Sequence, residues 1–292
     1  MTAPLLQNRV ALVTGASRGL GLAIAGHFLA AGARLVVCAR TQASIDAGAA
    51  SLRTAHGAQA PLLAVAADVS KPPDVARLIA QAVDRFGGID VLVNNAGVQG
   101  PLGPLETVDG QAWARAVEVN LLGSVLLAQA VLPRMKRQGW GKIIQLSGGG
   151  ATRPMAGMSA YAASKAAVVR FVETLALEVS GTGIDVNALA PGALNTDMLD
   201  EVLAAGPAKV GEARHADALR QKATGGASLQ EAAALAVFLA SAQSDGISGR
   251  LISAVWDHWR QLPAHKAELE GSDVYTLRRI TALERGFDWG DR

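Results

Sequence analysis

The sequence predicts an α/β protein with a doubly wound parallel sheet in three layers, built as a single domain. Short apolar segments rich in β-branched residues alternate along the chain with longer helical patterns. Continuously apolar strands are typical of a parallel sheet that helices cover on both faces. Alternation with right-handed crossovers then produces the doubly wound arrangement. The predicted strands are 9–14, 34–38, 62–67, 89–93, 142–146, 184–189 and 250–255.

Helices are expected between these strands. The first follows a glycine-rich turn and ends near residue 31. Residues 191–228 are expected to be irregular, because glycines and charges interrupt any periodic pattern there. The remaining predicted helices are 41–55, 72–86, 110–136, 159–179 and 229–240.

No linker or repeat divides the chain, so residues 1–255 are predicted to form one domain and residues 256–292 a C-terminal extension. The extension contains Trp256, Trp259 and Trp289. If a helical turn places the first two on one face, they should pack on the domain, over the substrate pocket, or against a neighbouring subunit. The alternative is an extension that only thickens the surface. Three apolar residues at a spacing of three, 274, 277 and 280, predict a short amphipathic helix.

Composition excludes several classes of function. The net charge is only +2 and basic residues are not clustered, which argues against a nucleic-acid partner. The single cysteine, Cys38, lies in an apolar run and is expected to be a buried core residue. The five histidines lack ligand spacing, so no metal is expected. With no signal segment and no apolar run of about 18 residues, we expect a cytoplasmic protein with no membrane partner.

A glycine-rich turn joins the first strand to the first helix. Gly15 allows a backbone turn that a side chain would strain, and Gly19 and Gly21 permit close approach of a pyrophosphate. Amides at the helix N-terminus would face the phosphates. At the first strand–helix junction, this pattern favours a nucleotide site over a ligand-free loop.

The spacing of these glycines resembles that of the short-chain dehydrogenase/reductase family, whose fold is Rossmann-like. Further motifs match in the family's order over about residues 9–255. The resemblance implies nicotinamide cofactor binding through Gly15, Ser17, Arg18, Gly19, Leu20, Gly21, Arg40, Asp68, Val69, Asn94, Ala96, Gly97, Tyr161, Lys165, Pro191, Gly192 and Thr196. Within this set, Asp68 resembles the acid that contacts adenine, and Pro191, Gly192 and Thr196 resemble the segment that closes over the nicotinamide. The implied catalytic set is Asn120, Ser147, Tyr161 and Lys165.

The chemistry of that set can be argued from the residues themselves. Tyr161 and Lys165 are four apart on a predicted helix and share a face. A free tyrosine titrates near about pH 10, and a neighbouring ammonium lowers that value toward the range useful for acid–base catalysis. Ser147 follows the fifth strand, at the edge where such sheets bind ligands, and its hydroxyl could hold a substrate oxygen. Asn120 is either a structural hydrogen bonder or, as the family implies, part of a water relay behind Lys165.

The second strand ends without the acid that usually binds the ribose of NAD. Arg40 stands there instead, and Arg18 lies in the glycine turn. Two guanidinium groups suit a 2′-phosphate, which predicts NADP(H) rather than NAD.

The resulting prediction is an NADP(H)-dependent oxidoreductase that interconverts a carbonyl and an alcohol, with a small-molecule substrate whose identity the sequence does not reveal. The alternatives are a non-catalytic NADP(H)-binding regulator and an epimerase or dehydratase using the same Tyr–Lys pair. The two long helices carry apolar residues over more than one face, which predicts a homo-tetramer or homo-dimer. These residues are Leu121, Leu122, Val125, Leu126, Val168, Val169, Phe171, Val172 and Leu175.

Overall fold

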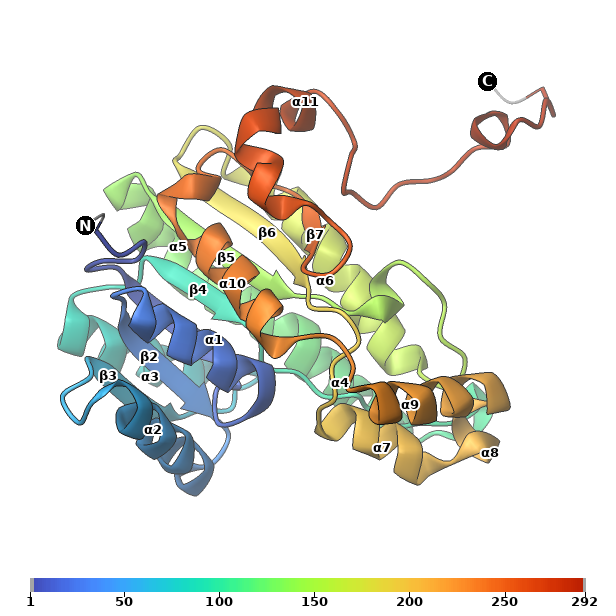
Figure 1. The fold of residues 1–292 in the computed structure, drawn as a ribbon, viewed down its shortest axis with the longest axis horizontal. Coiled ribbons are helices and arrows are strands. Elements are labelled where there is room, and N and C mark those ends of the chain that lie inside the picture. The colour runs from blue at the N-terminus through green and yellow to red at the C-terminus, as the bar shows by residue number, and fades with distance from the viewer. Residues whose placement is uncertain (1–2, 291–292) are drawn as a thin grey trace.

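A computed structural model describes residues 3–290. The first two residues of the predicted domain and the last two of the predicted extension, 1–2 and 291–292, lie outside the described residues. Seven parallel strands form one sheet in the order β3-β2-β1-β4-β5-β6-β7 (Figure 1). This confirms the predicted fold class. The strands are β1 Val10–Thr14, β2 Arg34–Ala39, β3 Leu62–Ala66, β4 Val91–Asn94, β5 Gly141–Leu146, β6 Ile184–Ala190 and β7 Leu251–Ser253.

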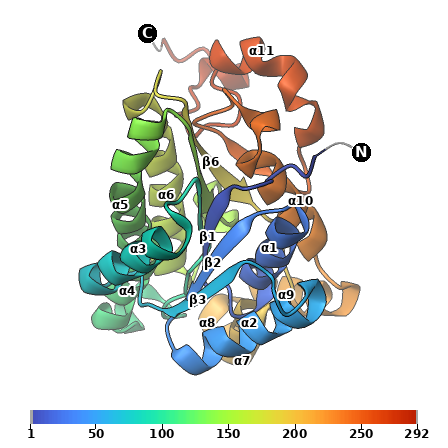
Figure 2. The ribbon, with the colours of Figure 1, turned by 90° about the vertical axis from the view of Figure 1, so that its left-hand side faces the viewer.

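Helices cover both faces of the sheet (Figure 2). Because successive strand residues point to opposite faces, Ala11 and Val13 enter one apolar core and Val10 and Leu12 the other. The first face carries α1 Gly19–Ala30, α2 Gln42–His56 and α10 Leu229–Ala240. The second carries α3 Pro72–Phe86, α4 Gly110–Val117, α5 Gly123–Gln138 and α6 Ser159–Glu178.

The segment predicted to be irregular is largely helical, which corrects the sequence expectation. It contains α7 Asp197–Ala205, α8 Pro207–Val210 and α9 Glu212–Thr224. These helices share a small apolar cluster with Met158, which lies just before α6. We call α7–α9 the lid, because they cover the N-terminal end of α6 (Figure 1).

The helix from 110 to 138 runs through α4, a π-helical segment Glu118–Leu122 and α5. Its length and apolarity would suffice for a membrane span, and the bent pair α9 and α10 passes the same test. No membrane-spanning helix was expected from the sequence, because Glu118 and Asn120 interrupt the apolar residues. In the fold the long helix lies against the sheet between α3 and α6, and this packing covers part of its apolar surface.

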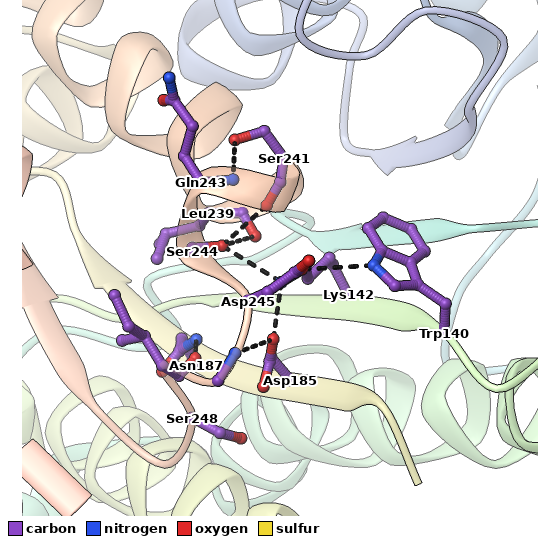
Figure 3. Close-up of polar contacts among 12 residues, drawn as sticks. Trp140, Lys142, Asp185, Asn187, Leu239, Ser241, Gln243, Ser244, Asp245 and Ser248 are labelled. Carbon is purple, nitrogen blue, oxygen red and sulfur yellow. Dashed lines mark hydrogen bonds and ion pairs between the residues drawn. The ribbon is translucent and has the colours of Figure 1, made fainter. Parts of the chain in front are cut away.

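A buried ionic network lies at the amino-terminal edge of β5 and β6, the opposite edge from the ends of the strands that precede the catalytic candidates (Figure 3). Lys142 is only 1% exposed, and its ammonium lies 2.6 Å from a carboxylate oxygen of both Asp185 and Asp245. Ser244 also accepts a hydrogen bond from Lys142, at 3.3 Å. The network joins both strands to the segment that follows α10.

The C-terminal extension packs on its own domain as far as residue 277. Trp259 is buried against Phe238 of α10, with ring centroids 5.4 Å apart, whereas Trp256 is 82% exposed. The two tryptophans therefore do not share a packed face as predicted. The short helix α11 Lys266–Glu270 follows. It lies at the opposite end of the molecule from the lid, so the described part of the extension does not cover the lid (Figure 1).

Backbone contacts hold residues 269–277 against the sheet edge. Arg250 donates to the carbonyls of Leu269, Ser272 and Val274. On the outer side of β7, Leu251 N donates to the carbonyl of Tyr275, and Ser253 N to the carboxylate of Asp257 at 2.7 Å. The helix predicted around residues 274–280 does not form, because these contacts hold the segment in a non-helical path.

Several apolar side chains on the two long helices remain uncovered within one chain. Leu122 is 48% exposed, and Leu121, Val125, Leu126 and Phe171 are only partly buried. The remaining members of the predicted set lie inside the chain's own core: Val168, Val169, Val172 and Leu175.

We therefore expect light scattering at micromolar concentration to give two or four times the chain mass of 30.0 kDa. Leu122→Glu should shift the protein toward smaller species, because it places a charge on the uncovered face. Glu178→Gln, an exposed change at the end of α6, is the control. A wild-type mass of one chain would contradict the prediction.

Candidate active site

The glycine turn after β1 is shaped by close backbone contacts. Gly15 and Gly19 have φ values of +62° and +57°, which L side chains rarely adopt. A Cβ on Gly21 would lie 2.3 Å from the carbonyl oxygen of Gly15. A Cβ on Gly19 would meet only a Thr196 methyl at 3.9 Å, so this part of the turn leaves room for a ligand.

Asn95, which was not among the predicted site residues, holds this turn to β4. Its side-chain amide donates to the carbonyls of Thr14 at 2.9 Å and Gly15 at 3.1 Å. In return, the Thr14 hydroxyl accepts from the amides of Asn95 and Ala96. The pair of asparagines at the end of the fourth strand could have identified Asn95 from the sequence. Asn94 is buried and donates to the Ser124 carbonyl, whereas Asn95 faces the turn.

Asn120 lies inside the π-helical segment and is fully buried. Its side chain accepts from Val98 N at 2.8 Å and donates to the Val98 carbonyl and the Ser164 hydroxyl, each at 2.9 Å. The sequence left two roles open for Asn120, a structural hydrogen bonder or part of a water relay. These bonds favour the structural role. They fix the segment after β4 against α6, and π-helical insertions are often found at functional sites.

The other three catalytic candidates converge where β5 ends. Lys165 donates to the carbonyl of Leu146 at 2.6 Å, and its ammonium lies 6.0 Å from the ring centre of Tyr161. A Cβ on Gly148 would lie 2.2 Å from the Tyr161 hydroxyl, so glycine is needed for that hydroxyl to reach the strand end. The neighbouring Ser147 hydroxyl is buried and has no hydrogen-bond partner among the described residues.

Burial dominates the electrostatics of this pair. It lowers the pKa of Lys165 to about 8, because a low-dielectric site disfavours the ammonium. It raises the pKa of Tyr161, and the positive charge of Arg214 offsets part of that rise. The lowering that the sequence argument assigned to Lys165 is not found: the cation that lowers the Tyr161 pKa belongs to α9.

The predicted adenine side is more constrained than the motif suggests. One oxygen of Asp68 accepts from the backbone and hydroxyl of Ser70, and the other lies 2.5 Å from the Arg115 guanidinium. Burial alone would raise the pKa of Asp68, but these bonds outweigh it and the pKa is lowered. The next residue, Val69, packs closely on Gly123, because a Cβ on that glycine would clash with the valine side chain. This contact joins the loop after β3 to the long helix.

The remaining predicted cofactor residues surround the same strand ends. Gly97 lies beside Lys165, since a Cβ there would be 3.7 Å from the ammonium. Gly192 has φ +88° and packs against Val255, and Pro191 directly precedes it after β6. Thr196 directly precedes α7, at its N-cap position. Ser17 and Leu20 lie within and just after the turn.

The two predicted phosphate-binding arginines differ in their surroundings. Arg40 directly follows β2 and is exposed. Arg18 forms an ion pair with Asp197 at the start of α7, with Nε 2.8 Å from the carboxylate oxygen, so it joins the glycine turn to the lid. Cys38 is buried and burial raises the pKa of its thiol to about 12, which leaves it no role as a nucleophile.

These features fit a dinucleotide with a nicotinamide ring. The open turn at Gly19 begins α1, whose first amides lack intrahelical partners and attract phosphate. The sheet order places β1 beside β4, and the strand order reverses direction between these two strands. Doubly wound folds bind ligands in the crevice at this point of reversal. The unpartnered Ser147 hydroxyl beside Tyr161 provides a place for a substrate oxygen.

The chain belongs to the short-chain dehydrogenase/reductase family of oxidoreductases: the family model described as short chain dehydrogenase matches residues 9–206. Among curated relatives, it is 38% identical over 250 residues to short-chain reductase protein NovJ of Streptomyces niveus, covering 84% of this chain and 92% of the relative. It is 37% identical over 191 residues to human (Homo sapiens) dehydrogenase/reductase SDR family member 4, covering 65% of this chain and 68% of the relative.

Solved structures agree with this assignment. Levodione reductase superposes with a TM-score of 0.78 at 30% identity, covering 89% of this chain and 99% of that one. A variant of actinorhodin polyketide ketoreductase with NADPH gives a TM-score of 0.76 at 31% identity, covering 84% and 95%.

Proposed function

We propose that this protein is an NADP(H)-dependent oxidoreductase that interconverts a carbonyl and an alcohol, with Tyr161 as the acid and base. The observation that carries the proposal is the position of the Tyr161 hydroxyl against Gly148, the residue after the buried, unpartnered Ser147, with Lys165 on the same helix as Tyr161. Membership of an oxidoreductase family supports the reaction class.

In the direction of reduction, Ser147 donates a hydrogen bond to the carbonyl oxygen and supports the charge that builds on it. A bound nicotinamide cofactor supplies the hydride. Tyr161 gives its proton to the forming alkoxide. Lys165, on the same helix, then returns a proton to the Tyr161 phenolate and regains its own from solvent, and Asn120 keeps the surrounding segment in place. Oxidation reverses these steps.

A screen for oxidation of NADPH and NADH with ketones, aldehydes and sugar derivatives tests this proposal. Loss of NADPH absorbance with at least one carbonyl class is the expected result. Cofactor binding without any turnover would favour a regulator, and conversion without net redox change would favour an epimerase. The names of the relatives give no common substrate, since they include a D-beta-hydroxybutyrate dehydrogenase and a levodione reductase.

The preference for NADP(H) rests on Arg40, and we expect Arg40→Asp to reduce or reverse it. The wild type should bind NADPH at least about ten-fold more tightly than NADH, because a guanidinium forms strong charge-assisted bonds to phosphate. Arg53→Asp, at the far end of α2, makes the same change in net charge and should leave the preference intact. Equal wild-type affinities for both cofactors in a fluorescence titration would refute this prediction.

A further inference from the structure

The lid brings one cation close to Tyr161. Its helices pack on the start of α6 through an apolar cluster, and the Tyr161 ring is in contact with that cluster. A Cβ on Gly157 would lie 2.5 Å from the carbonyl of Lys209, so the lid also touches the loop between β5 and α6. The members of the cluster are Leu102, Met155, Met158, Tyr161, Leu199, Val202, Leu203, Ala205, Val210 and Ala218.

Arg214 lies on the inward side of α9. Ala218, one turn further along the same face, is fully buried in the cluster, and Gln221 donates to the Leu194 carbonyl below the lid. The position of Arg214 is therefore set by a packed helix face and not by a free loop. Tyr161 packs against the cluster that contains Ala218, one turn from Arg214, and the positive charge of Arg214 partly offsets the rise in the Tyr161 pKa.

Arg214 has no partner of its own. Its Nε is buried without a hydrogen bond, and no carboxylate in residues 3–290 forms an ion pair with it. Asp217, three residues further along α9, pairs with the exposed Arg220 instead. A buried donor on a guanidinium is costly to leave unpaired, so a ligand that supplies an acceptor gains the whole of that interaction.

We propose that Arg214 is a specificity-determining residue that binds an anionic group of the substrate. The substrates are then oxo acids and the corresponding hydroxy acids, in which a carboxylate or sulfonate lies a few bonds from the reacting carbonyl. With the carbonyl oxygen at Ser147 and Tyr161, the anionic end lies toward α9. A planar guanidinium matches the two oxygens of such a group. This inference rests on the proposed function.

The rival explanation is that Arg214 acts only on Tyr161, by lowering its pKa for every substrate. The two explanations differ in one measurable quantity, the ratio of kcat/KM for an oxo acid to kcat/KM for its methyl ester. A residue that contacts the anion changes this ratio. A residue that acts only on Tyr161 changes both rates together and shifts the pH profile to higher pH.

The test uses 3-oxobutanoate, 4-oxopentanoate and 5-oxohexanoate with their methyl esters, so that the carboxylate stands at three distances from the carbonyl. The wild type is compared with Arg214→Leu, Arg214→Lys and the control Arg220→Leu, which removes an exposed guanidinium from the same helix. Thermal unfolding and cofactor affinity establish that each variant is folded. For at least one pair, the acid-to-ester ratio should fall about 10- to 100-fold in Arg214→Leu. It should fall less in Arg214→Lys and stay within about two-fold of wild type in Arg220→Leu.

A binding measurement separates this inference from the proposed function. Calorimetry of each oxo acid into protein saturated with its oxidised cofactor reports a dead-end complex in which no reduction can occur. Arg214-dependent binding without turnover would support the anion site and refute the reductase. Turnover of the esters with an unchanged ratio in Arg214→Leu would support the reductase and overturn the anion site. Failure of all three acids to bind the wild type would also overturn it.

Discussion

Replacing Tyr161 by Phe should lower kcat by at least about 1,000-fold while the affinity for NADP(H) changes by less than about two-fold. The hydroxyl is the group placed to exchange a proton with the substrate oxygen at the end of β5, where the Lys165 ammonium is bonded to the Leu146 carbonyl. The ring itself packs in the lid cluster, and Phe keeps that contact.

The matched control is Tyr275→Phe, since Tyr275 is the second of only two tyrosines and lies in the extension at the other end of the molecule. Steady-state kinetics and a cofactor titration on both variants distinguish loss of chemistry from loss of binding. Activity near the wild-type level in Tyr161→Phe would eliminate the proposed mechanism.

Replacing Lys142 by Met should lower the free energy of unfolding by about 3 kcal/mol, because it leaves the buried Asp185 carboxylate without its cation. Asp185 would keep only a backbone hydrogen bond from Gly246 at 3.1 Å. Kinetics should be little affected in the folded fraction, since the network lies at the edge of the sheet away from Tyr161.

Urea denaturation at a fixed protein concentration measures this effect. The double variant Lys142→Met/Asp185→Leu should recover much of the loss, because it removes both charges together. Asp245→Asn should cost no more than about 1 kcal/mol, since that carboxylate is half-exposed and water can replace the pair. A Lys142→Met variant as stable as the wild type would show that the buried pair contributes nothing.

The sheet could be predicted closely from the sequence because each strand carries its own local signal. Residues 35–39 form a continuous apolar run with two valines between Arg34 and Arg40, and β2 forms at Arg34–Ala39, close to the predicted strand 34–38. The helix predicted at 72–86 begins with two prolines and ends at a glycine, and α3 has the same bounds. Burial on both faces leaves such segments few alternatives.

The lid and the extension could not be predicted because their conformations depend on contacts distant in sequence. In α9 only Ala218 is buried, so its sequence shows little periodicity, and its position is decided by Met158 and the other cluster members. In the extension, the spacing of 274, 277 and 280 favours a helix. Arg250 and Glu173 instead bind the backbone of this segment, and Glu173 accepts from Leu277 N at 2.6 Å.

The candidate site divides in the same way. Tyr161 and Lys165 share a helix and Ser147 ends a strand, so motif and periodicity together could place them. The role of Asn95 in holding the glycine turn depends on the register of β1 and β4. Arg214 belongs to no motif, and its significance comes only from the fold of the lid, which packs α9 into the cluster that Tyr161 contacts.

The contacts of the extension with β7 also decide how the sheet terminates. An outer strand with free amides is a template for pairing with another chain, and proteins commonly block such edges against aggregation. Here the two outward amides of β7 are already taken by the Tyr275 carbonyl and the Asp257 carboxylate. A chain cut before Asp257 would expose an adhesive strand edge together with the Phe238 surface that Trp259 covers, whereas a cut after Leu277 would leave both protected.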